Sequence, residues 1–293
     1  MDDQRRWEEL DVDCLVSIFG RVGMESLLLD VPFVCKSWYK ATLNPSCWQS
    51  LIFPELTTDP FGFNLEDTFI ERFVNEYRLD ESRFSATAFI KFVISRSKGK
   101  ATALRLSRCA SEDALKYAAD DCHLFSWVSC PNGSGIAPRF SENKSSIIQE
   151  VIGKWTHLEW LVLGSSYNLE NFLGQICIHC KDLSRLSVAN AYIGKDTAVA
   201  IVSSLPKLKQ LILKKANIGR DDLVTLLQGC KELVHLDVSD CIGFNEEDEE
   251  ISKLASHIAN FSSKGSTLFD YDDDDFDGTF YLDEVVYDGY GSN

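Results

Sequence analysis

Two cysteines, Cys177 and Cys180, form a C-x-x-C pattern in a chain of 293 residues that contains ten cysteines. This spacing is typical of zinc knuckles and of thiol redox pairs. A structural zinc site needs a second pair of ligands, but the sequence holds no second C-x-x-C and no H-x-x-x-H. The five histidines fall in no hydrolase or metalloprotease motif, and no phosphate-binding Gly-rich loop is present. We therefore expect no catalytic residues, no metal and no cofactor.

An acidic segment offers a second possible chemistry, the binding of calcium. "DDDFDGTFYLDE" matches the loop pattern D-x-D-x-D-G-x5-E, with its carboxylates on Asp273, Asp275, Asp277 and Glu284. A calcium-binding EF-hand also needs a helix on each side, and neither flank of this loop has helical spacing. We interpret residues 259–293 as a disordered acidic tail, and a calcium-responsive regulator remains an alternative.

The overall charge of the chain is concentrated in two places. The net charge is -16, and most of it comes from "EEDEE" at 246–250 and from residues 265–293, which hold nine acids and no Lys or Arg. The remainder is almost neutral, so the basic surplus that nucleic-acid binding requires is missing. The chain starts with charged residues and has no apolar run of ~18 residues, which predicts no signal peptide and no membrane span. We expect a protein of the nucleus or the cytoplasm, in which the cysteines stay reduced.

The strongest pattern in the sequence is a repeat with a period of 25 residues. The template L-x-x-L-x-L occurs as "LEWLVL", "LSRLSV", "LKQLIL" and "LVHLDV", which start at Leu158, Leu183, Leu208 and Leu233. Each copy has another apolar residue three positions upstream: Trp155, Cys180, Leu205 and Cys230. Weaker copies start at Ala101 and Leu124, so we expect about six repeats over 98–258. Such a unit is a short strand followed by a helix or turn, and it buries its apolar face only when neighbouring units stack into a curved solenoid.

Alternation along each strand predicts which side chains line the concave face of that solenoid. The leucines point inward, and the residues between them point outward. In the second weak copy the alternation assigns Ser126, Val128 and Cys130 to the outward side. An outward Trp beside Arg and Lys has the composition of a protein-binding surface, although scattered surface residues would look the same. The predicted target-binding residues are Arg105, Trp160, Val162, Arg185, Ile212, Lys214, His235 and Asp237.

The first 52 residues lack the 25-residue period and show three short helical patterns. Leu15, Ile18, Phe19 and Val22 share one face of a helix that Asp11 or Asp13 could cap. A second helix is predicted in "ESLLLD", ended by Pro32. A third is predicted from the shared face of Val34, Trp38 and Ala41, and Pro45 closes it. A core of this size is too small to be stable alone, so we expect it to dock onto something else.

These residues resemble the F-box, the helical module that binds the Skp-family adaptor of SCF ubiquitin ligases. The family pattern is L-P, four spacer residues, L-x-x-I-F, a second L-P, an apolar helix, V-C-x-x-W, and a final Pro and Trp. The matching residues are Leu10, Leu15, Ile18, Phe19, Val22, Leu27, Val34, Cys35, Trp38, Pro45 and Trp48. The chain departs from the pattern at both prolines, where it has Asp11 and Gly23. In an F-box, Cys35 and Trp38 are structural and pack the third helix, so they need neither metal nor redox chemistry.

An F-box followed by cysteine-containing leucine-rich repeats is similar to the plant F-box/leucine-rich-repeat proteins. The resemblance implies an α/β (α+β overall) fold: an F-box at 1–52, a helical linker at 53–97, repeats at 98–258 with a parallel sheet on the concave face, and the tail at 259–293. It also implies a substrate-recognition subunit that binds a Skp-family adaptor, and through it cullin and RING subunits, and that presents an unknown protein target. An interaction scaffold whose degenerate F-box no longer recruits the ligase is the alternative.

Overall fold

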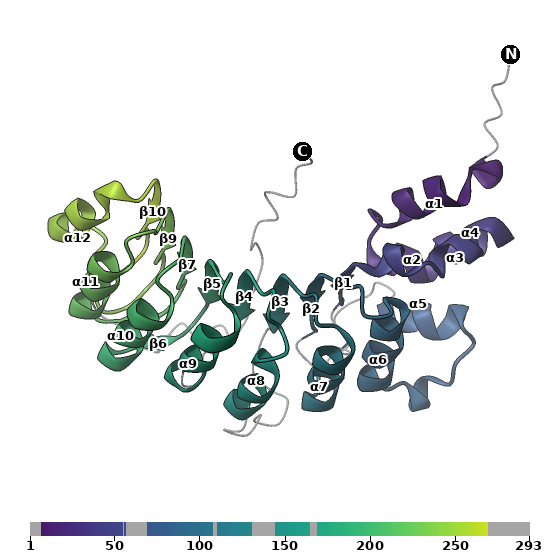
Figure 1. Cartoon of the computed structure of the whole chain (residues 1–293), viewed down its shortest axis with the longest axis horizontal. Helices are drawn as coiled ribbons and strands as arrows, with labels where there is room; N and C mark the ends of the chain where they lie inside the picture. The colour runs from purple at the N-terminus through teal and green to yellow at the C-terminus, as the bar shows by residue number, and fades with distance from the viewer. Residues whose placement is uncertain are drawn as a thin grey trace, which may run out of the picture.

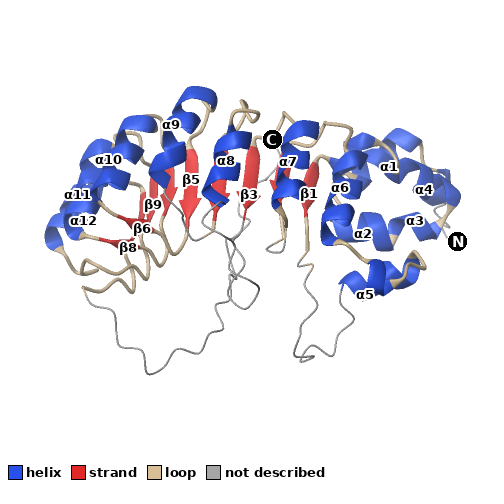
Figure 2. Ribbon diagram, turned by 90° about the horizontal axis from the view of Figure 1, so that it is seen from below, coloured by secondary structure: helices blue, strands red, loops and turns tan. Residues whose placement is uncertain are grey.

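The protein is an arc of parallel strands and helices with a helical module at one end (Figure 1). This computed structural model describes residues 7–54, 56, 69–107, 110–130, 144–164 and 169–268. The sheet lines the concave side of the arc and the helices lie on the outer side (Figures 1 and 2). The prediction of an α/β solenoid is therefore confirmed.

Eight short parallel strands form the main sheet, in the order in which they occur along the chain. They are β1 (Ser50–Ile52), β2 (Ala103–Arg105), β3 (Trp127–Cys130), β4 (Trp160–Leu163), β5 (Arg185–Val188), β7 (Gln210–Ile212), β9 (His235–Asp237) and β10 (Asn260–Ser262). The helices of the outer layer are α6 (Ala86–Arg96), α7 (Glu112–Asp121), α8 (Lys144–Ile152), α9 (Leu169–His179), α10 (Lys195–Ser204), α11 (Arg220–Gly229) and α12 (Glu249–Leu254). The ladder begins before residue 98 and continues past residue 258.

The register of the sheet places one apolar residue of every strand in a single inward row. This row consists of Leu51, Leu104, Val128, Leu161, Leu186, Leu211, Leu236 and Phe261. All but Phe261 are fully buried between the sheet and the outer helices. Each repeat thus contributes one layer to a continuous core, which is why a single repeat cannot be stable without its neighbours.

The predicted register of the second weak repeat is wrong by one residue. Val128 was assigned to the outward side with Ser126 and Cys130, but it pairs with Leu104 and Leu161 in the inward row and is fully buried. The outward residues of β3 are instead Trp127 and Ser129. The side chains of a strand alternate between its two faces, so the shift by one residue exchanges them all.

A second ladder follows the strands of the C-terminal repeats. It contains β6 (Tyr192–Ile193) and β8 (Asn217–Ile218), and single bridges continue it through Ile242 to Thr267. The turn before each of these segments has one residue with positive φ: Asn190, Lys215, Asp240 and Gly265, at intervals of 25 residues. The backbone N–H of Asn190, Lys215 and Asp240 donates to the carbonyl of the next repeat, at 2.9 to 3.0 Å. This turn is therefore part of the bonding between repeats.

The helical module at the N-terminal end has four helices where the sequence predicted three. They are α1 (Val12–Phe19), α2 (Met24–Leu29), α3 (Val31–Val34) and α4 (Lys36–Thr42), with 3-10 turns η1 (Trp7–Glu9) and η2 (Pro45–Trp48). Pro32 was expected to end the second helix, but it lies in the first turn of α3. Proline is tolerated there because the first helical N–H groups have no partner within the helix.

Two helices, α5 (Phe69–Glu76) and α6, connect this module to the repeats. On α5, Arg72 forms ion pairs with Glu25 at 2.7 Å and with Asp30 at 3.1 Å, and the Tyr77 hydroxyl donates to the Leu28 carbonyl at 3.0 Å. The module is therefore fixed to the first part of the arc by polar contacts as well as by packing. The division into residues 1–52, 53–97, 98–258 and 259–293 stays a prediction.

The candidate calcium ligands Asp273, Asp275, Asp277 and Glu284 lie outside the described residues, as do residues 269–293 of the predicted tail. For residues 259–268 the prediction of disorder is wrong, because they form β10, which pairs with β9, and the bridge of Thr267 to Ile242. Within the described ranges, no helix combines the length and the apolar character that crossing a bilayer requires.

Candidate protein-interaction surfaces

The helical module is organised around the aromatic side chains of α1 and α4. Leu15 and Phe19 are almost completely buried, and the Phe19 ring meets the Trp38 ring edge-on, with centroids 5.2 Å apart. The Trp38 indole N–H donates to the Trp7 carbonyl at 3.3 Å. These residues therefore act mainly as the internal support of α1, which they hold against α4.

The end of the module is anchored by Trp48, which occupies the first apolar position of the β1 repeat. Its indole N–H donates to the Thr42 carbonyl at 2.6 Å, and its ring is fully buried. Nearby, the Cys47 thiol lies 3.4 Å from the Ala41 carbonyl, and burial raises its pKa to about 11. Cys47 is thus a protonated, buried thiol that fills the core at neutral pH.

Part of the predicted adaptor-binding set faces solvent. Ile18 on α1 is 44% exposed and Val34 at the end of α3 is 59% exposed. Other large apolar side chains of the module are exposed as well: Trp7, Val12, Phe33, Tyr39 and Leu43. By contrast, Leu15, Phe19, Leu27 and Trp48 are buried, and Leu10, Val22, Cys35, Trp38 and Pro45 are partly buried. We call Val12, Ile18, Phe33, Val34, Tyr39 and Leu43 the exposed apolar set of the module.

The two positions where the F-box pattern has proline serve as helix starts in this chain. Asp11 is the N-cap of α1, and its carboxylate accepts a hydrogen bond from the Asp13 N–H at 2.8 Å. Gly23 is the N-cap of α2, with φ -63°. Both replacements are therefore compatible with the local helix geometry, because Asp and Gly are common N-cap residues.

Two outward rows of the main sheet form the concave face. The first row is Ser50, Ala103, Trp127, Trp160, Arg185, Gln210, His235 and Asn260, and the second is Ile52, Arg105, Ser129, Val162, Ser187, Ile212, Asp237 and Ser262. Seven of the eight predicted target-binding residues lie in these rows. The eighth, Lys214, follows β7 and forms an ion pair with Asp237 at 3.3 Å.

An aromatic and cationic stack crosses the middle of the concave face. The Trp127 and Trp160 rings lie 5.5 Å apart between centroids, and the Arg185 guanidinium lies 4.9 Å from the centroid of the Trp160 ring. Arg185 also pairs with Glu159, at 3.8 Å. Flat aromatic surface next to a guanidinium is the composition of binding hot spots.

The C-terminal part of the same face is polar and held in place by a hydrogen-bond network. The Asp237 carboxylate accepts from the Ser239 N–H at 3.0 Å and from its hydroxyl at 2.6 Å. The Ser239 hydroxyl also lies 2.7 Å from that of Ser262. Because Asp237 is fixed in this way and pairs with Lys214, it offers little free negative charge to a ligand.

The sequence pattern did not place Trp127 in the outward rows of the sheet, where it lies with only 7% of its surface exposed. A signal for it was present: "FSWVSC" matches the template when the repeat is started at Phe125, which is fully buried, whereas Leu124 is 46% exposed. Trp127 then stands at the same position as Trp160, 33 residues later. The error arose because apolar residues occupy both alternating sets of positions in this short segment, so the sequence does not show which set points inward.

The C-x-x-C cysteines lie in different surroundings. Cys180 is buried, its thiol is 3.4 Å from the Trp155 carbonyl, and burial raises its pKa to about 12. Cys177 is half-buried on α9. A thiol with so high a pKa is a poor nucleophile and a poor metal ligand at neutral pH, since both roles need the thiolate. Among the described residues, no group of three or more His, Cys, Asp or Glu side chains is placed to hold a metal ion.

The chain is similar to known plant proteins over most of its length. No family model matches the chain. The F-box/LRR-repeat protein At3g48880 of Arabidopsis thaliana is 28% identical over 238 residues, which are 80% of this chain and 72% of that protein. The F-box protein FBW2 of the same plant is 24% identical over 294 residues, 95% of this chain and 84% of that protein. The F-box protein SKIP19 is 24% identical over 257 residues, with 83% and 72% covered. These matches extend over most of the chain, and they make it a homologue of the plant F-box/leucine-rich-repeat proteins.

Proposed function

We propose that this chain is a substrate-recognition subunit of an SCF-type ubiquitin ligase. In this proposal the N-terminal module binds a Skp-family adaptor, and through it the cullin and RING subunits, while the concave face binds a protein target. The chain itself performs no chemistry. It brings the target close to the ubiquitin donor, and proximity of this kind can account for a large part of a reaction barrier.

The observation that carries this proposal is the pairing of two separate surfaces on one arc. The module exposes the apolar set around Ile18 and Val34, while the sheet presents Trp160 and Arg185 on the concave face. The names of the relatives, F-box and F-box/LRR-repeat proteins, support the interpretation of the module as an F-box, and a Skp-family adaptor is the partner that we propose for it. The contacts of Arg72 and Tyr77 with the module support a fixed separation of the two surfaces, which would help delivery of a bound target.

A charge placed in the exposed apolar set tests adaptor binding. Ile18→Asp should abolish capture of a purified Skp-family adaptor, because it puts a carboxylate into an interface from which water is excluded. We expect the dissociation constant to rise at least 100-fold, as measured by surface plasmon resonance. Leu15 is unsuitable for this test, because it is buried and Leu15→Asp would unfold the module.

A matched control is available on the outer layer of the repeats. Ile178 on α9 is 58% exposed, so Ile178→Asp makes the same chemical change far along the chain from the module. It should leave adaptor capture unchanged. If the wild-type chain captures no adaptor, the chain is instead a repeat scaffold that acts without the ligase. If both variants lose capture to the same extent, the exposed apolar set is not the surface that binds the adaptor.

A further inference from the structure

The concave face carries more positive than negative charge, although the net charge of the chain is -16. Arg105 and Arg185 lie in the two outward rows of the main sheet, and the one carboxylate in these rows belongs to Asp237. The charge of this face is therefore opposite in sign to that of the whole chain.

Four turn positions extend the concave face beyond the ends of the strands. They directly precede the positive-φ residues and are Ala189, Lys214, Ser239 and Lys264. Lys214 pairs with Asp237 at 3.3 Å, and the Ser239 hydroxyl donates to the same carboxylate at 2.6 Å, so both side chains lie on the concave side. Lys264 has the equivalent position in the next repeat, where its carbonyl accepts from the Asp240 N–H at 2.9 Å. It adds a further cation to the face.

Three of these cations are available to a ligand. Arg105 and Lys264 are exposed, and neither forms an ion pair within the described part of the chain. Arg185 lies 3.8 Å from the exposed carboxylate of Glu159, a long contact in water that contributes little. Lys214 is neutralised by Asp237, which leaves no free carboxylate in the described rows. The face therefore attracts an acidic ligand and repels a basic one.

Apolar side chains lie between the cations. Trp160 and Val162 on β4 and Ile212 on β7 point outward from the sheet and are half-buried. The Arg185 guanidinium lies 4.9 Å from the centroid of the Trp160 ring, so a charged and an apolar contact are available side by side. A ligand that uses both needs an apolar side chain close to its acidic ones.

The cations are too far apart for one small anion to hold. Arg105 on β2 and Arg185 on β5 are three strands apart, which is roughly 14 Å at about 4.8 Å per strand. Lys264 follows β10, three strands further on, so the whole row of cations spans roughly 29 Å. An extended chain advances about 3.4 Å per residue and covers this span in about nine residues. A linear segment with several carboxylates fits these positions, whereas a single phosphate does not.

We propose that the concave face binds an extended, acidic segment of the target protein, whose carboxylates contact Arg105, Arg185 and Lys264 and whose apolar side chain packs on Trp160. The carboxylates speed the encounter and fix the register, and the contact with the ring supplies affinity. That the ligand is the target of a ligase rests on the proposed function, but the preference of the face for acidic peptides does not.

Selection from a random peptide library tests the composition of the ligand. The immobilised full chain is offered phage that display random peptides of about twelve residues, which is long enough for the whole span. The retained peptides should contain at least twice as many Asp and Glu residues as the input library, together with a large apolar residue. One of them is then synthesised with a fluorescent label, and fluorescence anisotropy gives its dissociation constant.

Charge-reversed variants show where this peptide binds. Arg185→Glu with Lys264→Glu should raise the dissociation constant at least 20-fold, because both changes replace attraction by repulsion. Lys195→Glu with Lys231→Glu changes the net charge equally at two exposed positions outside the face, and should alter the constant less than threefold. Trp160→Ala removes the apolar contact and should raise the constant about tenfold.

The reversed face should itself select peptides rich in Lys and Arg, a gain that unfolding cannot produce. A wild-type selection without enrichment in acids, or a labelled peptide that binds both double variants equally well, would overturn the proposal. Capture of a purified Skp-family adaptor is measured in parallel. A chain that captures the adaptor but selects no acidic peptides keeps the proposed function and loses this inference. A chain that selects acidic peptides without capturing the adaptor loses only its place in the ligase.

Discussion

At the level of single residues, one turn position shows how the repeats constrain the sequence. Asn190, Asp240 and Gly265 are types that accept the left-handed conformation, but the equivalent Lys215 has φ 57° with a long side chain. The left-handed region costs roughly 1–2 kcal/mol for most residues other than glycine, asparagine and aspartate. Of the four equivalent turn positions, Lys215 is therefore the one whose residue type is strained in the left-handed conformation.

Relief of that strain should stabilise the protein. Lys215→Gly removes the Cβ that causes the strain, and part of the gain is lost to the greater freedom of glycine in the unfolded chain. We expect the free energy of unfolding to rise by about 0.5 kcal/mol in urea denaturation. Lys231→Gly is the control, because Lys231 is exposed and does not have a positive φ. It should lower the stability by a similar amount, and a loss in both variants would contradict the strain at Lys215.

The residues also show where sequence patterns succeed and where they fail. The four copies that start at Leu158, Leu183, Leu208 and Leu233 place every inward leucine correctly, because the same template recurs four times at a spacing of 25 residues and so fixes one register. Around Trp127 and Val128 both phases are apolar, so only pairing with Leu104 and Leu161 decides which side chain is buried. Which molecule binds to either surface depends on the partner as well as on this chain, and a pattern within one chain contains no information about that partner.

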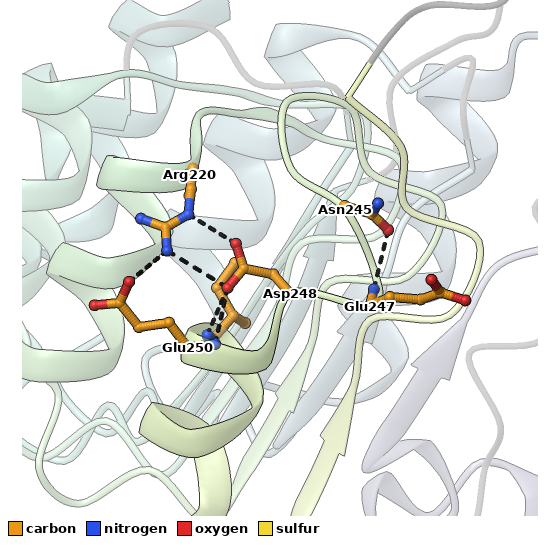
Figure 3. Close-up of polar contacts among 6 residues, drawn as sticks. Arg220, Asn245, Glu247, Asp248 and Glu250 are labelled. Carbon is orange, nitrogen blue, oxygen red and sulfur yellow. Dashed lines mark hydrogen bonds and ion pairs between the residues drawn. The ribbon is translucent and has the colours of Figure 1, made fainter.

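At the level of elements, the C-terminal end of the arc is closed by a charged cluster (Figure 3). Arg220, the first residue of α11, donates to the Asp248 carboxylate at 2.7 Å and to that of Glu250 at 2.5 Å. Asp248 also caps α12, where it accepts from the Glu250 and Ile251 N–H groups, both at 3.0 Å. One carboxylate thus starts α12 and ties it to α11. Two residues of the run 246–250 that raised the net charge are structural.

The cluster should make the stability of the protein depend on pH. The hydrogen bond from Arg220 holds the pKa of Asp248 below its ordinary value of 3.8. A carboxyl group whose pKa is lowered on folding contributes stability above its unfolded pKa, and loses that contribution as the pH falls through the folded pKa. We therefore expect Asp248→Asn to be less stable than the wild type at pH 7, with a difference that shrinks below about pH 4. Urea denaturation at several pH values measures both quantities.

The control for this effect is a carboxylate of the same type without the network. Asp196 lies exposed in the first turn of α10, so Asp196→Asn changes the net charge equally but breaks no ion pair described here. Its effect on stability should be smaller. If the free energies of unfolding of the wild type and Asp248→Asn differ by the same amount at pH 7 and at pH 3.5, the negative charge of Asp248 does not contribute to stability.

Not every element was visible in the sequence. β1 and β10 were missed because each is a three-residue strand without the full leucine template, although Ile258 and Ala255 continue the period of 25 from Leu233 and Cys230. α3 was missed because Pro32 was taken as a stop signal. In both cases the sequence pattern is too short to distinguish a strand or helix from a loop, and packing against the neighbouring element determines the structure.

At the level of the whole molecule, an aromatic cluster joins the helical module to the repeats. Phe73 on α5 stacks on Tyr77 with centroids 4.5 Å apart and meets Phe89 on α6 edge-on at 4.9 Å. Tyr77 in turn donates its hydroxyl to the α2 backbone at Leu28. Phe73 is nearly fully buried. Phe73 therefore contacts aromatic side chains on both sides of the joint between the module and the repeats.

We expect loss of this side chain to destabilise both surfaces together. Phe73→Ala leaves a cavity in the joint and should lower the free energy of unfolding by about 3–5 kcal/mol. Hydrogen exchange should show faster opening in α1 to α4 and also in β1 and β2, because the module is too small to hold its structure once its support is weakened.

Phe244→Ala, the control, removes a fully buried ring at the other end of the arc. In a repeat array each unit contacts mainly its neighbours, so this variant should open the C-terminal repeats and leave the module protected. If the module keeps its protection in Phe73→Ala, it folds independently of the repeats. The separation between the adaptor-binding and target-binding surfaces would then depend on a flexible connection, and the fixed geometry proposed for this protein would be wrong.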